Sequence, residues 1–193
     1  MIALRKPLIL ASVSARRQEL LSLIGVKYTI MPSLAKEAFT QTDPQKLVLS
    51  LAEQKASDVA DRTIEDALVL GADTLVVQGP RILGKPKDFE DAVAMLQLLQ
   101  GKKHTVYTGI CAIDARSGRK EYHVEATQVE ICPLTDAQIR AYIATGEPMD
   151  KAGAYAVQGL FAVYIKGIIG CYYNVMGLPL HATKELLERF NKI

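Results

Sequence analysis

Hydrophobic positions along the chain alternate between short continuous runs, typical of strands, and runs with one apolar face, typical of helices. The clearest strand is the almost unbroken apolar run 67–77, as expected for a central strand covered on both faces. The clearest helix begins at Pro44, where apolar residues recur every four positions and form one buried side. The whole pattern predicts strands at 6–11, 67–77, 104–114, 120–131, 162–166 and 171–175, and helices at 15–24, 44–60, 88–100, 135–146 and 181–190.

The order of these elements predicts the fold class. Strands and helices alternate through most of the chain, which is typical of an α/β protein. The strands 104–114 and 120–131 are joined by residues 115–118, a short segment that predicts a hairpin turn and hence an antiparallel part of the sheet. The length allows one domain or two closely joined halves. We therefore predict an α/β fold with a mixed β-sheet flanked by helices, in a single domain that spans residues 1–193.

Composition and charge narrow the classes of partner and compartment. The formal net charge of the 193 residues is only +2, which argues against the broad basic surface of a nucleic-acid-binding protein. The three cysteines, Cys111, Cys132 and Cys171, are widely spaced, so they predict neither a disulfide framework nor a zinc site. No apolar stretch approaches the length that crosses a membrane. We therefore expect a cytoplasmic protein that binds neither nucleic acid nor membrane.

An unusual charge pattern marks the start of the first predicted helix. If Ser14 is the N-cap, Arg16 and Arg17 lie in the first turn, where unpaired backbone N–H groups already make the helix end positive. Each arginine there costs about 0.3–1 kcal/mol, the amount that an acidic residue would contribute. Together with Ser12, these groups predict a cradle for a phosphate. The alternative is a pair of solvated arginines on a surface helix.

Two charged residues interrupt apolar patterns. Asp73 lies inside the apolar strand 67–77, where an ionised carboxylate requires a cation, a metal or strong hydrogen-bond donors. It is either a structural residue that caps a neighbouring turn, or a metal ligand or general base acting on a phosphate ester. Lys55 interrupts the buried side of the helix that begins at Pro44. It either extends along the surface to solvent or reaches a phosphate.

Three further polar residues lie in predicted loops. The segment 79–85 has the spacing of a phosphate-binding P-loop, but Pro86 replaces the metal-binding hydroxyl, so we predict a hairpin or loop that ends at Lys85. The side-chain amide of Gln158 suits the edge of a nucleobase, although on spacing alone an ordinary surface glutamine explains the residue better. Nothing local distinguishes Glu37 from a solvated loop carboxylate.

Five segments taken together resemble the Maf family of nucleoside triphosphate pyrophosphatases over nearly the whole chain. They are LASVSARRQELL (10–21), LAEQKA (51–56), GADT (71–74), GKP (84–86) and DKAGAY (150–155), and they follow one another in the family's order. The chain departs from the family at Ala15, where a proline is usual. Because proline suits the first helical position, this change loosens the start of the helix without removing a charge.

The resemblance implies hydrolysis of a nucleoside triphosphate between its α and β phosphates, which gives a monophosphate and pyrophosphate. It also implies the fold of the inosine triphosphate pyrophosphatases and a homodimer. Asp73 is similar to the proton acceptor or metal-held carboxylate, and Glu37 to the acidic residue that shares the metal. Because these ligands are hard oxygens, we expect Mg²⁺ or Mn²⁺. The positions that match phosphate-binding residues are Ser12, Arg16, Arg17, Lys55 and Lys85.

Three positions identify the branch of the family that the chain resembles. Arg16, Thr74 and Gln158 match the arginine, threonine and glutamine of the branch that acts on dTTP and UTP, and possible substrates include modified pyrimidine nucleotides. One alternative is a 7-methyl-GTP pyrophosphatase, the sister branch that differs at these positions. Another is a non-catalytic regulator of cell division that senses a nucleotide, although such a binder has little need of a carboxylate at Asp73 beside a polyanion.

Overall fold

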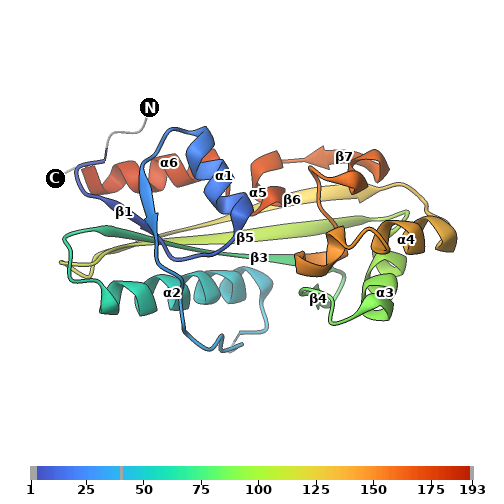
Figure 1. Ribbon diagram of the computed structural model, residues 1–193, viewed down its shortest axis with the longest axis horizontal. Coiled ribbons are helices and arrows are strands. Elements are labelled where there is room, and N and C mark those ends of the chain that lie inside the picture. The colour runs from blue at the N-terminus through green and yellow to red at the C-terminus, as the bar shows by residue number, and fades with distance from the viewer. Residues whose placement is uncertain (1–3, 40, 192–193) are drawn as a thin grey trace. The chain divides into compact units, whose positions relative to one another are not determined.

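The computed structural model describes residues 4–39 and 41–191, and a mixed β-sheet is its main feature (Figure 1). Within the described residues the sheet has seven strands in the order β2-β1-β3-β5-β6-β7, and β4 pairs with β3. The strands are β1 (Leu8–Leu10), β2 (Tyr28–Ile30), β3 (Leu68–Gln78), β4 (Arg81–Leu83), β5 (Lys103–Asp114), β6 (Lys120–Ile131) and β7 (Ile165–Ile169).

Parallel and antiparallel pairs share this sheet. β1 runs parallel to both of its neighbours, with Leu8 opposite Tyr28 on β2 and opposite Leu68 on β3. The β3–β4 and β6–β7 pairs are antiparallel. The predicted fold class, a mixed β-sheet flanked by helices, is therefore confirmed.

The helices begin close to the predicted positions because their N-caps are encoded locally. Asp43 accepts hydrogen bonds from the backbone N–H groups of Gln45 and Lys46, and Asp88 accepts one from Asp91. A capping box at Thr135 opens the fourth helix. The helices are α1 (Ala15–Leu23), α2 (Pro44–Arg62), α3 (Phe89–Leu99), α4 (Asp136–Ile143), α5 (Tyr172–Met176) and α6 (Leu180–Glu188), with 3₁₀ helices at Glu147–Asp150, Ala152–Ala154, Leu160–Tyr164 and Arg189–Asn191.

Two compact units make up the chain. The first unit comprises Met1–Asp73, Thr108–Glu125 and Gly177–Ile193, and the second comprises Thr74–Tyr107 and Ala126–Met176. In the first unit, α2 lies along one face of the strands, and α1 and α6 lie along the other (Figure 1). A Cβ atom on Gly71 would lie 2.3 Å from the carbonyl oxygen of Ala52, and one on Gly109 would lie 2.6 Å from that of Val48. These two glycines therefore let α2 pack directly on β3 and β5.

The second unit contains β4, β7, α3, α4 and α5, together with the remaining parts of β3, β5 and β6. α3 packs against α4. The same unit contains a cluster of aromatic rings, in which Phe161 contacts Tyr142, Tyr155 and Tyr164. Among the described residues Phe161 is the largest fully buried side chain, and its three ring contacts make it the centre of this unit's aromatic packing.

Three of the sequence predictions for short elements were wrong or incomplete. The strand expected at 162–166 is shifted to Ile165–Ile169, and the strand expected at 171–175 is the helix α5. The side chain of Asn174 explains the helix, because it donates to the carbonyl of Val106 and to the hydroxyl of Thr127. Such tertiary contacts override the strand preference of Cys171, Tyr172 and Tyr173. The edge strand β2 was not predicted.

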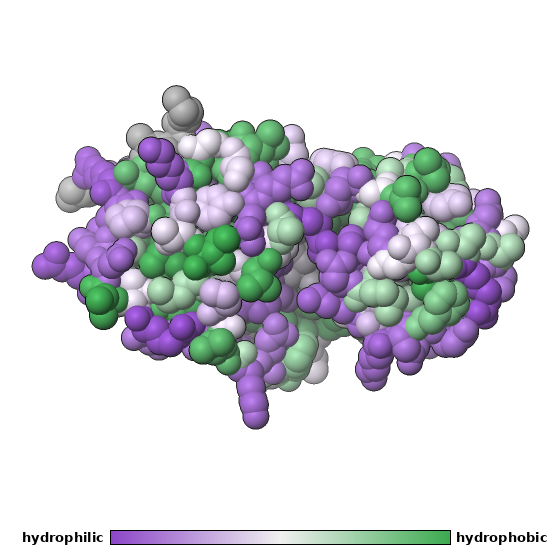
Figure 2. Space-filling model, viewed as in Figure 1, coloured by the Kyte–Doolittle hydropathy of each residue, from purple (hydrophilic) through white to green (hydrophobic). Residues whose placement is uncertain are grey.

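Figure 2 shows hydrophobic residues in separate groups among hydrophilic ones on the face that it draws. Scattered exposed hydrophobic residues of this kind are normal on a protein surface. Among the described residues, none of the helices combines the length and the apolar character that a membrane span requires.

Candidate active site

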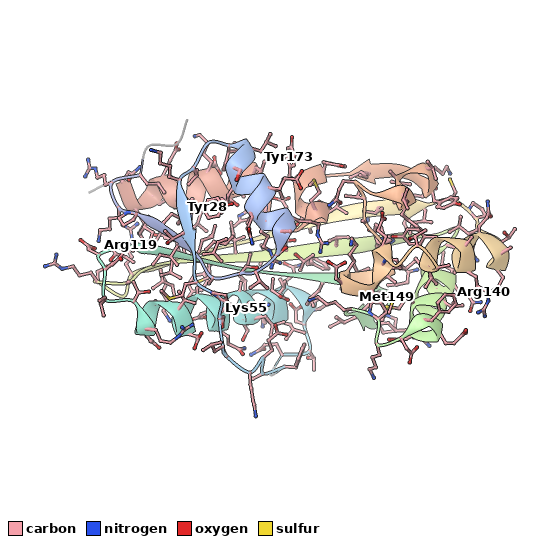
Figure 3. All side chains as sticks on the ribbon, in the orientation of Figure 1. Tyr28, Lys55, Arg119, Arg140, Met149 and Tyr173 are labelled. Carbon is pink, nitrogen blue, oxygen red and sulfur yellow. The ribbon has the colours of Figure 1, made fainter. Side chains whose placement is uncertain are left out.

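Lys55 on α2 and Asp73 on β3 form a close ion pair in the first unit, with 2.5 Å between Nζ and Oδ1. Figure 3 labels Lys55 on its helix. Both side chains are largely shielded from solvent, at 17% and 14% exposure. Strand geometry explains the contact. Residues 71 and 73 face the same side of β3, and Gly71 brings that side close to α2. Lys55 therefore does not extend to solvent, and Asp73 lies inside the strand and not at a turn.

Glu37 joins this pair from the loop that follows β2. Its Oε1 lies 2.9 Å from Nζ of Lys55, and its side chain is 42% exposed. Two carboxylates thus converge on one ammonium group, and the three groups carry one excess negative charge. This contact brings together three predicted site residues that are separated by up to 36 positions in the sequence.

The arrangement of Asp73 and Glu37 fits a hard divalent cation. Both carboxylates contact the ammonium of Lys55, which shows that their oxygens together attract a cation. Mg²⁺ is commonly held by one or two carboxylates, with water and substrate phosphates completing its shell. Among residues 4–39 and 41–191 no group of three or more His, Cys, Asp or Glu side chains could hold a metal ion. A metal held here would therefore take most of its ligands from substrate and water.

Ser12, Arg16 and Arg17, which were predicted to form a phosphate cradle, lie at the start of α1. Ser14 is at the N-cap with extended backbone, and no hydrogen bond from its side chain caps the described helix. Ser12 instead organises the turn, because its Oγ accepts from the backbone N–H of Ser14 and from Nη1 of Arg17. The first turn contains no acidic residue. The free backbone N–H groups of this turn therefore have no carboxylate from the helix itself beside them.

Arg17 anchors the cradle to the rest of the first unit. Its Nε donates to the carbonyl of Gly177 at 2.9 Å. Burial lowers the pKa of Arg17 from its ordinary value, while the negative charges of Asp73 and Glu37 act in the opposite direction and Arg16 adds to the lowering. These electrostatic interactions place Arg17 in the field of the two carboxylates. Arg17 nevertheless remains a cation, because a guanidinium does not lose its proton in proteins.

The other three predicted residues belong to the second unit. Thr74 follows Asp73 on β3 and is partly buried. Lys85 is exposed and follows the β3–β4 hairpin, which agrees with the predicted hairpin and not with a P-loop. Gln158 is exposed in the segment before the 3₁₀ helix Leu160–Tyr164.

Two of the sequence motifs meet in the second unit. The backbone N–H of Gly153 donates to the carbonyl of Gly84 at 3.0 Å, which joins segment 150–155 to the loop that holds Lys85. Gly153 (φ 70°) and Ala154 (φ 58°) both adopt the left-handed conformation. A Cβ atom on Gly153 would lie 2.9 Å from Cγ1 of Val76 on β3. Glycine is therefore required for the close approach of this segment to β3.

Sequence analysis missed the residues that hold the chain on either side of Gln158. Glu147 accepts a hydrogen bond from the hydroxyl of Tyr142 and another from the backbone N–H of Leu160, both at 2.9 Å. The hydroxyl of Tyr155 lies 2.8 Å from Nε2 of His104, which is buried. Neither Glu147 nor His104 breaks a local pattern, so their roles are visible only after folding.

A cavity of about 540 Å³ lies elsewhere in the first unit, at the amino ends of β1 and β2. It is lined by residues 4–8 and 25–29, and none of the predicted site residues contributes to it. The convergence of charged groups, and not this cavity, therefore locates the candidate site.

Comparison with known proteins covers almost the entire chain. A family model described as Maf-like protein matches residues 7–190. A dTTP/UTP pyrophosphatase from Pelotomaculum thermopropionicum is 49% identical over 186 residues, covering 96% of this chain and 97% of the relative. One from Desulforamulus reducens is 48% identical over 187 residues, with the same coverage. Among solved structures, a HAM1 protein from Coxiella burnetii is 14% identical, with a TM-score of 0.46 over 65% of this chain and 73% of that one.

Proposed function

The chain belongs to the Maf-like protein family, and on this basis we propose that it is an enzyme that hydrolyses dTTP and UTP to the nucleoside monophosphate and pyrophosphate. The observation that carries the proposal is the convergence of Lys55, Asp73 and Glu37. A cation between two carboxylates, with Arg17 in their field, is a set of charges suited to the hydrolysis of a phosphoric anhydride.

We assign to Asp73 the role of proton acceptor. Water attacks phosphorus, its proton passes to the Asp73 carboxylate, and the bond that joins the α and β phosphates breaks to release pyrophosphate. Lys55 holds the Asp73 carboxylate in place through the contact between Nζ and Oδ1. The Lys55 ammonium, fixed by this contact, also stabilises the negative charge that develops on the phosphate oxygens of the leaving group.

Phosphate binding is assigned to the start of α1. Ser12 and Arg17 are already fixed by their mutual hydrogen bond, so the cradle loses little conformational freedom when substrate binds. Arg16 and the exposed Lys85 supply further positive charge to the triphosphate, which carries close to four negative charges. Guanidinium groups are suited to phosphate because their N–H donors match the spacing of its oxygens.

Asp73 and Glu37 are proposed to hold one Mg²⁺ or Mn²⁺ ion. When bound, the ion polarises a phosphoryl oxygen and lowers the pKa of bound water. This assignment is supported by the hard oxygen chemistry of the two carboxylates and by their common contact with the Lys55 ammonium. Glu37 would then exchange its contact with Lys55 for a ligand bond.

Base selection is assigned to Gln158, Thr74 and Arg16. The side-chain amide of Gln158 has an NH₂ donor and a carbonyl acceptor, which can pair with the imide edge shared by thymine and uracil. The relatives from Pelotomaculum thermopropionicum and Desulforamulus reducens, both dTTP/UTP pyrophosphatases, support these two bases over 7-methylguanine. They equally favour an enzyme over a nucleotide-sensing regulator.

Assembly and location complete the proposal. We propose a homodimer, which the family resemblance supports, and a cytoplasmic protein, which the three free cysteines support because disulfides form mainly in oxidising compartments. We also propose that the two units act as one domain. Support comes from β3, β5 and β6, since each of these strands contributes residues to both units.

Pyrophosphate release from a panel of triphosphates tests the proposed function. The panel contains dTTP, UTP, CTP and 7-methyl-GTP, each with Mg²⁺ and then with EDTA. We expect metal-dependent release from dTTP and UTP. Release confined to 7-methyl-GTP would keep the chemistry but contradict the roles of Thr74 and Gln158. Binding of nucleotide without release from any of the four would favour the regulator.

A further inference from the structure

The loop that carries Glu37 is held against one face of α2 by side chains spaced four residues apart. Gln54, Asp58 and Arg62 lie on the same face of the helix because successive positions at this spacing are stacked along it. Asp58 accepts from the backbone N–H of Leu34 at 2.8 Å, and Arg62 donates to the carbonyl of Pro32 at 2.9 Å. These contacts fix the first part of the loop.

Gln54 fixes the part of the loop beside Glu37. Its Oε1 accepts from the backbone N–H of Ala38 at 2.9 Å, and its Nε2 donates to the carbonyl of Ala38 at 3.1 Å. Nε2 also donates to Oγ of Ser50 at 3.1 Å, which orients the amide from the helix side. The single amide group therefore satisfies both backbone polar groups of one loop residue, as a neighbouring strand would.

The contact between Gln54 and Ala38 also affects the position of Glu37. Glu37 and Ala38 are adjacent in the loop, and Lys55 and Gln54 are adjacent on the helix. Lys55 holds the Glu37 carboxylate, while Gln54 holds the backbone that follows it. Glu37 is an exposed residue outside any helix or strand, so its backbone has no other regular hydrogen bonding to position it.

We propose that Gln54 is a positioning residue that holds Glu37 where its carboxylate shares a divalent cation with Asp73. The inference rests on the proposed function for the cation's role in the reaction. It extends that function to a residue that touches neither substrate nor metal. Without the Gln54 amide, the loop backbone at Ala38 is free to move, and the Glu37 carboxylate then spends less time beside Asp73.

The test variant is Gln54→Met, which keeps the length and helix preference of the side chain but removes both hydrogen bonds to Ala38. Gln54→Asn, whose amide is one methylene too short to reach both groups, replaces it if the methionine variant does not fold. Gln45→Met is the matched control, because Gln45 is an exposed glutamine on the same helix. Ser50→Ala removes the third partner of Gln54 and leaves both bonds to Ala38.

Two measurements report on positioning without turnover. Hydrogen exchange of residues 34–39 follows the Ala38 amide directly, and it should be faster in Gln54→Met than in wild type or either control. Mn²⁺ binding is measured by electron paramagnetic resonance in the presence of α,β-methylene-UTP, which cannot be cleaved between these phosphates. We expect Gln54→Met to weaken Mn²⁺ binding about tenfold, the effect of one or two neutral hydrogen bonds. Binding of the nucleotide in EDTA should be unchanged.

A double-mutant cycle separates positioning from general loss of structure. If Gln54 acts through Glu37, Gln54→Met has no further effect on Mn²⁺ affinity in a Glu37→Gln background. Wild-type Mn²⁺ affinity in Gln54→Met, an additive effect in the double variant, or absence of Mn²⁺ binding to wild type would overturn the inference. A wild-type protein that binds Mn²⁺ but releases no pyrophosphate would refute the proposed function, while exchange and Mn²⁺ binding would still decide the role of Gln54.

Discussion

The ammonium of Lys55 and the carboxylate of Asp73, 18 residues apart in the sequence, meet at 2.5 Å between α2 and β3. The close packing of α2 on Gly71 makes this contact possible. Each charge partly compensates for the burial of the other, and removing one leaves its partner partly buried without compensation. Variants at the two positions should therefore separate their chemical roles.

Asp73→Asn should reduce turnover of dTTP at least about 100-fold, the lower limit for loss of a general base. The amide preserves size but cannot accept the proton from water. Nucleotide affinity, measured by isothermal titration calorimetry in EDTA, should change little, because the phosphate contacts come from other residues. Asp66→Asn, which alters an aspartate paired with Lys6 in the same unit, is the control. Normal turnover by Asp73→Asn would remove this residue from the mechanism.

Lys55→Met should weaken nucleotide binding about 10- to 100-fold, as expected when one charge-assisted hydrogen bond to phosphate is lost. The rate should fall as well, because Asp73 loses the group that holds its carboxylate. Dissociation constants for α,β-methylene-UTP and initial rates of pyrophosphate release give the two effects. Lys46→Met changes an exposed lysine on the same helix and should match wild type. Equal affinities for Lys55→Met and Lys46→Met would argue against a phosphate contact.

Gln158→Glu should change the preference between nucleotides more than it changes phosphate affinity. A carboxylate lacks the donor of the amide and meets the acceptor oxygens of the pyrimidine with a negative charge. Relative kcat/KM values for dTTP, UTP and CTP measure the preference. Gln128→Glu, an exposed glutamine on β6, adds the same charge in the second unit. If the relative values of Gln158→Glu equal those of Gln128→Glu, Gln158 does not read the base.

His104 should make the stability of the protein depend on pH. Burial lowers the pKa of His104 from 6.5 to about 4, so between these values the unfolded chain binds a proton that the folded protein does not. The free energy of unfolding therefore decreases as the pH falls through this range, by about 3 kcal/mol from this residue.

Urea unfolding of wild type and His104→Gln at pH 7 and pH 4 measures the contribution of His104. The decrease between the two pH values should be about 3 kcal/mol smaller in the variant, whose amide can still bond Tyr155 through one atom. His181→Gln alters a histidine whose side chain is 82% exposed and should retain the wild-type decrease. An identical pH dependence in wild type and His104→Gln would show that His104 does not cause it.

Parts of the site were visible in the sequence because they break a pattern. Lys55 interrupts an apolar helix face and Asp73 interrupts an apolar strand, and the structure places the two in contact. The phosphate cradle was predicted for a related reason, since two arginines in a first helical turn oppose the helix dipole. Long elements such as β3 and α2 were predicted well because their period and caps are local.

Features that depend on tertiary contacts could not be predicted in this way. Glu37 lies in a polar loop, and its place beside Asp73 depends on contacts from α2, including the Gln54 amide. The helix α5 has a sequence that favours a strand and depends on the buried bonds of Asn174. In both cases the deciding partner is at least 16 residues away in the chain, beyond the range of local propensity.

Phosphorus NMR of dTTP incubated with the wild-type protein and Mg²⁺ tests the central claim most directly, because it identifies which bond breaks. The account predicts equal amounts of dTMP and pyrophosphate, and unchanged dTTP when Asp73→Asn replaces the wild type under the same conditions. Formation of dTDP and orthophosphate, or dTTP left intact by the wild-type protein, would contradict it.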